Sequence, residues 1–319
     1  MEVSRRLELP PVATYAALNL WNFTSTGSSF DCLEDLRALH TFTGTESESW
    51  FYLVSVAIEC RGGRIIPTVL RALNAVQTRD FKVISDALKE LTDCIVALGG
   101  LLDRMHERCD PLIFYHEIRP FLTGSKNAAG LPDGVYYDQG HGRGAWLQLR
   151  GGTNGQSSLI HLLDIVLGVK HASKGGVSAK ADESNVREKT TFHEEVRSYM
   201  PGPHRRFLER VEEMDSIRDL ALEPAATREQ EAFREEFQKA AAELALFRNK
   251  HLALVARYIV VPSRQPRTVE SRRAADALPR RSAEEPDTLK GTGGTTLLPF
   301  LKYSRDETLN AGILKKGAN

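Results

Sequence analysis

The chain has 319 residues, of which 41% are hydrophobic and 26% charged, and these values are ordinary for a globular protein with a sizeable core. The 42 Lys and Arg residues balance the 42 Asp and Glu residues, so no net field attracts nucleic acid or an anionic membrane. No run of about 18 apolar residues could form a membrane helix, and no signal peptide is recognisable at the N-terminus. We therefore expect a cytoplasmic protein without nucleic-acid or membrane partners.

The cysteines support the same compartment. There are four of them, with no CxxC pair and no spacing typical of a zinc site. We interpret them as free thiols in a reducing environment. They are Cys32, Cys60, Cys94 and Cys109.

Helical periodicity dominates the chain, and the fold class that it predicts is all-α. The helix over 47–62 starts with acidic residues and then becomes almost wholly apolar, which indicates burial on most sides. The helix over 80–108 has a regular inner stripe of apolar residues. Further helices are expected over 111–123, 156–170, 203–214 and about 227–261, the last closed by a strand-like YIVVP.

Two segments interrupt the helical pattern. Residues 124–155 contain nine glycines and predict a long irregular connection, which in compact domains tends to be functional or disordered. Residues 263–290 combine prolines and charges of both signs with little aliphatic content, which predicts a flexible linker. The chain then becomes apolar again, so we expect this linker to return Gly291–Thr295 (GTGGT) to the core as a lid.

The long helix over 227–261 carries a histidine on its apolar face. His251 lies on the stripe formed by Phe247, Leu254 and Tyr258, and Arg248 lies one turn earlier on the same side. A buried imidazole with a nearby cation is what a haem requires, namely a ligand for iron and a partner for a propionate. The alternative is a core histidine hydrogen-bonded to backbone, and this helix alone favours that alternative.

Two other apolar helices carry polar side chains. Ser55 lies one turn after Phe51 and can line a pocket, or it can bond the carbonyl four residues back. Arg119 lies one turn after Tyr115 on an apolar face, where it must be paired with an acid or must hold an anionic ligand. Phe114 and Tyr115 beside it favour a slot for a planar molecule with a carboxylate.

The glycine-rich segments do not predict a nucleotide site. The segment over 151–158 (GGTNGQSS) opens a helix and supplies capping residues, but it lacks the GK[ST] of a phosphate-binding loop. The GTGGT segment lacks it too. No Ser-His-Asp or Cys-His set is recognisable by spacing, and no distal acid or base stands out.

Seven blocks of the sequence together resemble the indoleamine 2,3-dioxygenase family of cytosolic haem enzymes. They follow the family's order and span residues 15–302, so the resemblance covers nearly the whole chain. The blocks are WFYLVSVAIE, IFYHEIRPFLTG, LPDGVYY, GGTNGQSSLIHLLDIVLG, RSYMPGPHRRFLE, FRNKHLALVARYIVVP and KGTGGTTLLPFLK. The resemblance shifts the interpretation of His251 towards iron ligation.

The resemblance implies haem b as the cofactor and assigns residues around it. His251 matches the proximal ligand of the iron, and Arg248 matches the arginine that pairs with a propionate. Asp164 matches an acidic position of the scaffold on the proximal side. Gly152 and Thr153 match the loop beside the distal face.

The resemblance also implies a site for L-tryptophan and O2. Arg119 matches the residue that binds the substrate carboxylate, and Phe114 and Tyr115 match the aromatic pair over the indole. Thr292 matches the threonine of a mobile loop that closes over the substrate. The distal wall is matched by Tyr15, Ser55, Phe51 and Tyr52, of which the last two are expected to contact the haem.

The chain departs from the family pattern at several positions in the pocket. The best-known members have phenylalanine at the position of Tyr115 and Ser-Ala at the positions of Thr153 and Asn154. Leu18 and Asn19 also differ from the small and apolar residues expected there. A larger and more polar wall is expected to weaken tryptophan binding.

The family places a small N-terminal helical domain before the block that starts near Leu9. We therefore interpret residues 1–25 as the remnant of that domain with a connecting segment, and residues 26–319 as the helical haem-binding catalytic domain. Without that domain, we expect the apolar surface around Tyr15, Trp50, Phe51 and Tyr52 to be partly exposed.

The function that the resemblance implies is insertion of both atoms of O2 across the indole double bond of L-tryptophan, which gives N-formylkynurenine. The expected enzyme is a monomer with ferrous haem, in which the protein positions the substrate and excludes water. The alternative is a non-catalytic haem protein that binds O2 on the same fold. Such a protein would need His251 and Arg248 but not Arg119, Tyr115 or the GTGGT loop, so these residues favour the enzyme.

Overall fold

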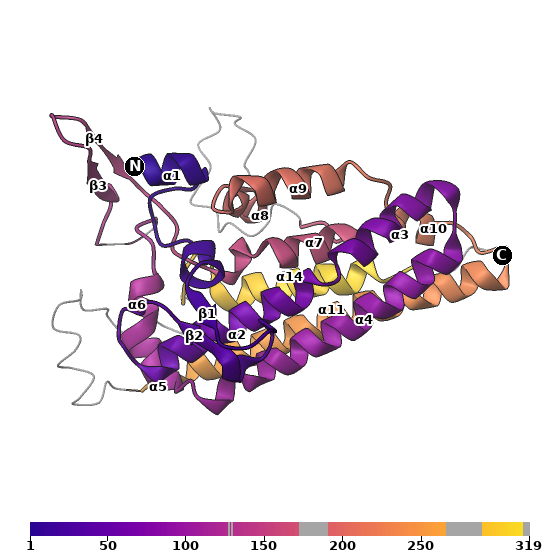
Figure 1. Ribbon diagram of the computed structural model, residues 1–319, viewed down its shortest axis with the longest axis horizontal. Coiled ribbons are helices and arrows are strands. Elements are labelled where there is room, and N and C mark those ends of the chain that lie inside the picture. Colours follow the sequence, from indigo (N-terminus) through magenta and orange to yellow (C-terminus); the bar gives the residue numbers. More distant parts are fainter. Residues whose placement is uncertain (127, 129, 172–190, 266–288, 315–319) are drawn as a thin grey trace.

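Two long helices run side by side along the longest dimension of the computed structural model (Figure 1). They are α4 (Phe81–Asp103) and α11 (Arg228–Val255), and α2, α3 and α14 pack against them. The structure describes residues 1–126, 128, 130–171, 191–265 and 289–314. Most of the linker predicted over 263–290 therefore lies outside the described residues.

The remaining elements are mostly helical, which confirms the predicted fold class. The other α-helices are α1 (Glu2–Leu7), α2 (Glu46–Gly63), α3 (Ile66–Thr78), α5 (Pro111–Ile113), α6 (Arg119–Leu122), α7 (Ser158–Val166), α8 (Phe192–Arg197), α9 (Gly202–Glu212), α10 (Ile217–Leu222), α12 (Val261–Ser263) and α14 (Leu297–Ala311). Short 3-10 turns are η2 (Leu33–Asp35), η3 (Arg104–Glu107) and η5 (Asn154–Gln156), and π-helical turns are η1 (Ala16–Leu20), η4 (Phe114–Ile118) and η7 (Ala256–Val260).

Helix α2 is buried on most sides, as its apolar composition predicts. Thr45 caps its N-terminus by accepting a hydrogen bond from the Glu48 backbone at 3.2 Å. The Glu48 side chain is fully buried, and its carboxylate accepts hydrogen bonds from the Phe42 and Thr43 backbones and from the Tyr52 hydroxyl at 2.7–2.8 Å. A buried carboxylate with this many donors is stable without a cation.

The long helix α11 does not end in a strand, so the expectation for YIVVP was wrong. The chain continues from Val255 through the π-helical η7 into α12. Tyr258 and Ile259 are buried there, and the Tyr258 hydroxyl donates to the Cys109 carbonyl at 2.9 Å. Packing against η4 thus overrides the β-propensity of this branched and aromatic run.

The glycine-rich segment over 124–155 is more regular than predicted. It contains the antiparallel hairpin of β3 (Val135–Asp138) and β4 (Gly144–Leu147), which projects from the helical body (Figure 1). A second antiparallel pair joins β1 (Phe23–Ser25) to β2 (Leu36–Ala38) near α2. The glycines at 140 and 142 adopt positive φ angles in the β3–β4 turn, where other residues would be strained.

The expected exposure around the N-terminal block is also wrong. Tyr15, Trp50 and Tyr52 are only 5%, 3% and 1% exposed, and Phe51 is half-buried. The indole of Trp50 donates to the Arg104 carbonyl at 2.8 Å and lies beneath the Arg108 guanidinium. Contacts from within the chain therefore cover these aromatic side chains.

The division into residues 1–25 and 26–319 stays a prediction. Leu18 of the N-terminal segment belongs to the same hydrophobic core as α2 and α4. None of the helices that the structure describes is both long and apolar enough to cross a membrane.

Candidate functional site

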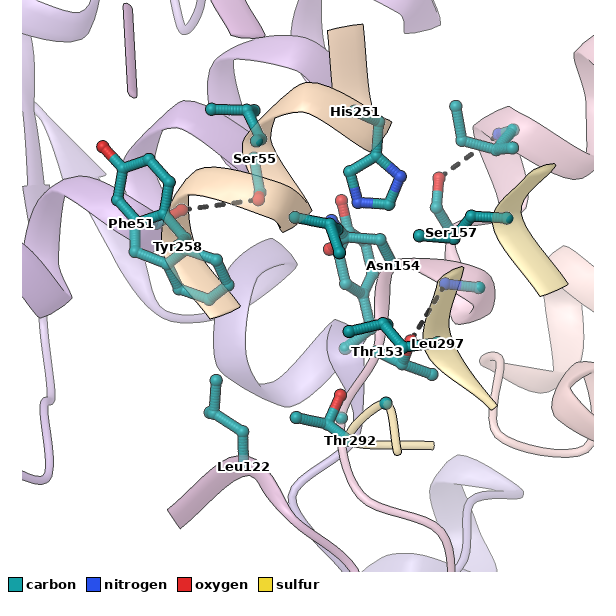
Figure 2. A pocket seen from close by; sticks show the side chains of 18 of the residues that line it. Phe51, Ser55, Leu122, Thr153, Asn154, Ser157, His251, Tyr258, Thr292 and Leu297 are labelled. Carbon is teal, nitrogen blue, oxygen red and sulfur yellow. Dashed lines mark hydrogen bonds between the residues drawn. The ribbon is translucent and has the colours of Figure 1, made fainter. Parts of the chain in front are cut away.

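One cavity brings together almost all of the residues that the sequence predicted. It lies among α2, the C-terminal part of α11, the loop over 151–157 and the segment over 291–301. Its lining includes eleven of the twelve predicted site residues: Tyr15, Phe51, Tyr52, Ser55, Phe114, Arg119, Gly152, Thr153, Arg248, His251 and Thr292. Figure 2 shows His251, Ser55 and Ser157 towards one side of this cavity and Thr292 and Leu122 towards the other.

All three π-helical turns of the described residues contribute to the lining. They supply Leu18 and Asn19 from η1, Phe114 from η4, and Tyr258 and Ile259 from η7. A π-helical turn re-aims side chains that an α-helix would place elsewhere, and such turns are frequent at functional sites.

The imidazole of His251 faces the cavity without a protein partner. Neither ring nitrogen hydrogen-bonds to a described residue, so the interpretation as a core histidine bonded to backbone does not hold. Burial, together with the nearby charge of Arg248, lowers the pKa of His251 to about 4. The ring is therefore neutral at pH 7 and has a lone pair available for a metal.

Arg248 is fixed by an ion pair one turn from His251. Its guanidinium donates to both carboxylate oxygens of Asp164 at 2.5 and 2.7 Å and to the Ser304 carbonyl at 2.9 Å. Burial alone would raise the pKa of Asp164, but the charge of Arg248 and the His171 side chain outweigh it and hold that pKa well below its usual range. Asp164 does not line the cavity itself but orients a residue that does.

Arg119 is buried towards the opposite side of the cavity. It is 2% exposed, and its guanidinium donates to the backbone carbonyl of Lys290, next to the GTGGT segment. The Tyr115 ring lies beneath that guanidinium, with 5.5 Å from its centroid to the Arg119 Cζ. Tyr115 is absent from the lining that the described residues form, and its ring packs against the Arg119 guanidinium, so its predicted contact with a ligand stays a prediction.

Phe114 is the member of the predicted aromatic pair that faces the cavity. Its ring packs against Phe51 at 4.8 Å and edge-on against Tyr258 at 5.9 Å between centroids. These three rings form an apolar wall for a flat molecule.

Comparison with known proteins identifies the chain. The sequence profile described as indoleamine 2,3-dioxygenase matches residues 1–311. The indoleamine 2,3-dioxygenase nanC of Aspergillus nanangensis is 42% identical over 97% of this chain and 72% of its own length. The chain belongs to the indoleamine 2,3-dioxygenase family.

Other relatives match this chain over a similar share of their own length. The indoleamine 2,3-dioxygenase of Saccharomyces cerevisiae is 37% identical over 99% of this chain and 71% of its own length. The 6-hydroxytryptophan 2,3-dioxygenase fscD of Fusarium equiseti is 37% identical over 98% of this chain and 72% of its own length. This member of the indoleamine 2,3-dioxygenase family is a haem-dependent dioxygenase.

The residues of the cavity fit a haem. The porphyrin supplies four nitrogens to the iron, so the protein has to supply only one ligand. A neutral imidazole without a protein partner, such as that of His251, is suited to this role. Arg248 supplies a cation beside it, and the walls are mostly apolar, as a porphyrin face requires. The set of donors therefore agrees with the cofactor of the family.

Ser55 satisfies both interpretations made from the sequence. Its hydroxyl donates to the Phe51 carbonyl at 3.4 Å, the back-bond expected of a helical serine. The same residue lines the cavity (Figure 2). The weak back-bond leaves the hydroxyl oxygen able to accept a hydrogen bond from a ligand.

Glu59 is an acid in the cavity wall that the sequence analysis missed. Its Oε1 accepts hydrogen bonds from the Tyr15 hydroxyl at 3.0 Å and from the Ser157 hydroxyl at 2.5 Å. Burial raises the pKa of Glu59, and the two hydroxyls offset part of that rise. Its position one turn after Ser55 on α2 is a sequence signal that could have found it.

His193 also lines the cavity, although no role was assigned to it from the sequence. Its ring stacks on His171 with 3.7 Å between centroids and on Phe300 with 5.4 Å. Burial and the nearby His171 lower the pKa of His193 to about 2, so its ring is neutral. His171 lies between Asp164 and Glu307, at 3.1 and 2.6 Å.

Proposed function

We propose that this enzyme cleaves the indole ring of L-tryptophan with O2 and produces N-formylkynurenine. One observation carries the proposal: a neutral, unpartnered imidazole and a buried guanidinium line the same apolar cavity, in His251 and Arg119. Bound ferrous haem b supplies the activation of O2. The protein's own residues then have to hold the haem, orient the amino acid and exclude water.

Each of these tasks has a candidate residue. His251 holds the iron and Arg248 pairs with a propionate. Arg119 binds the substrate carboxylate through its planar set of N–H donors, one of which contacts the Lys290 carbonyl. Phe114 would pack on the flat indole and Phe51, beside it, would contact the haem, so that the substrate is held in one orientation.

Glu59 favours ring-substituted tryptophan as a second candidate substrate. Its Oε1 accepts the hydrogen bonds from the Tyr15 and Ser157 hydroxyls, whereas its Oε2 accepts no hydrogen bond from a described residue. A free carboxylate oxygen in the wall suits a hydroxyl group on the substrate's ring. The Fusarium relative is named for 6-hydroxytryptophan, which is a substrate of this kind.

The test is a ferrous-haem spectrum followed by an aerobic assay for N-formylkynurenine. L-tryptophan and 6-hydroxytryptophan are compared by kcat/KM under the same conditions. We expect a Soret band and product from at least one of them. A Soret band without product from either would identify the alternative, a protein that binds haem and O2 without catalysis.

We further propose a monomer in the cytoplasm. The neutral net charge and the four unpaired cysteines support this location, since disulfides are rare there. Sedimentation of the haem-loaded chain tests the oligomeric state.

A further inference from the structure

The segment that carries Thr292 is held to the protein by two buried arginines. Arg119 donates to the Lys290 carbonyl and Arg150 donates to the Gly293 carbonyl, on either side of Thr292. The segment itself is a tight turn, with the Gly291 amide donating to the Thr295 carbonyl at 2.8 Å. A turn held at both flanks presents the side chain between them in a fixed direction.

The position of Arg150 is fixed by contacts with neighbouring side chains. It is 8% exposed, its guanidinium donates to Glu195 at 2.5 Å, and its Cζ lies 4.9 Å from the centroid of the Phe192 ring. Its backbone amide donates to the Tyr199 hydroxyl at 2.9 Å. The guanidinium is therefore oriented by an anion and an aromatic face before it contacts the loop.

The two arginines differ in their access to a ligand. Arg119 lines the cavity, whereas Arg150 is absent from the lining formed by the described residues. A substrate carboxylate therefore competes with Lys290 for Arg119 but leaves the contact between Arg150 and Gly293 intact. This step rests on the proposed function of Arg119.

We propose that Arg150 is a positioning residue that holds the Gly291–Thr295 turn over the cavity and thereby directs Thr292 at the substrate. It acts through the backbone of Gly293 and touches neither substrate nor cofactor. Gly293 suits this contact, because a Cβ there would lie 3.1 Å from Thr153 and 3.3 Å from Phe192. The close approach lets the turn sit directly on the wall of the cavity.

The test compares the haem-loaded full chain with the variants Arg150→Ala and Arg150→Lys. The matched control is Lys126→Ala, because Lys126 pairs with the same Glu195 carboxylate but does not contact the loop. Hydrogen exchange of the amides over 289–297 is measured without substrate, and KM and kcat are measured separately with the substrate found active.

We expect exchange over 289–297 to rise roughly 10-fold or more in Arg150→Ala, the size of a lost charge-assisted hydrogen bond. KM should rise by a similar factor with an unchanged Soret band, whereas Lys126→Ala should resemble the wild type. Arg150→Lys should fall between them, because an ammonium lacks the planar fork by which the guanidinium donates to Glu195 and Gly293 in two fixed directions.

Wild-type exchange in both Arg150 variants would overturn the proposal, as would an equal rise in Lys126→Ala. If Arg150→Ala does not fold, Arg150→Lys decides by the same comparison. Because exchange is measured without turnover, a wild type that makes no product would contradict the proposed function and still leave the role of Arg150 tested.

Discussion

On the side of the cavity that carries His251, the charged group next to it is paired with another charged side chain, Arg248 with Asp164. On the side that carries Thr292, the arginine that lines the cavity, Arg119, donates to the backbone carbonyl of Lys290 next to the Gly291–Thr295 turn. Removing one partner of a buried ion pair leaves an uncompensated charge, whereas a carbonyl can be exchanged for a ligand oxygen without that cost. The side with His251 is therefore suited to a permanently bound cofactor, and the side with Thr292 is suited to a substrate that binds and dissociates in each turnover.

The largest effect is expected at the iron ligand. His251→Ala should abolish stable haem binding, because His251 lies one turn from Arg248, whereas the other histidine of the described lining, His193, stacks on His171 and Phe300. The measurement is the Soret absorbance per protein after reconstitution and desalting. His204→Ala is the control, since His204 bonds to Ser158 and does not line the cavity. An unchanged haem content in His251→Ala would contradict the assignment.

A large effect on stability is expected at the ion pair. Asp164→Asn should lower the free energy of unfolding by about 3–5 kcal/mol, because it leaves Arg248 buried without its anion. The folded-state pKa of Asp164 lies below its usual 3.8, so its stabilisation is present above that pH and is lost as pH falls. Denaturant unfolding at pH 7 and pH 3.5 should show a smaller pH dependence in the variant than in the wild type. An equal pH dependence of the free energy of unfolding in the variant and the wild type would contradict the stabilising role of the Asp164–Arg248 pair.

An intermediate effect is expected at Arg119, on the side of the cavity that carries Thr292. Arg119→Ala should keep its haem but lose tryptophan affinity roughly 10- to 150-fold, the value of a charge-assisted pair. Arg119→Lys should restore only part of this, since lysine lacks the bidentate geometry. Substrate titration of the haem spectrum measures the affinity. Unaltered binding in Arg119→Ala would mean that another group holds the carboxylate.

The smallest effect is expected at Glu59, with the opposite pH slope from Asp164. Burial raises the pKa of Glu59 above its usual 4.5, so its contribution to stability is present below that pH and is lost as pH rises through the folded-state value. Relative to Glu59→Gln, the wild type should therefore be less stable at pH 8 than at pH 5. Thermal unfolding at both pH values checks this, and a difference that is constant with pH would contradict it.

The same variant sharpens the choice of substrate. If the free Oε2 of Glu59 accepts a hydrogen bond from a ring hydroxyl, Glu59→Gln should lower kcat/KM for 6-hydroxytryptophan more than for L-tryptophan, by a few-fold. Equal effects on both would remove the argument for a ring-substituted substrate.

Local patterns in the sequence were sufficient for much of the fold and part of the site. The helix α2 and the starts of α4 and α11 were predicted closely, because burial on one face of a helix repeats every three to four residues. The α-helical geometry of α4 and α11 ends at Asp103 and Val255, before the predicted ends at 108 and 261. The same spacing placed Arg248 beside His251. The resemblance to the family then supplied the residues from other segments, and eleven of the twelve line one cavity.

Tertiary structure decided what depends on segments far apart in the chain. Ser157 meets Glu59 across 98 positions, and Arg150 meets Gly293 across 143. Of the two neighbours in η4, Phe114 lines the cavity, whereas the Tyr115 ring lies beneath the Arg119 guanidinium. Helical periodicity reports which face of one element is buried, but it carries no information on which distant element covers that face. For this reason the distant partners of Glu59 and Arg150 became visible only in the folded chain.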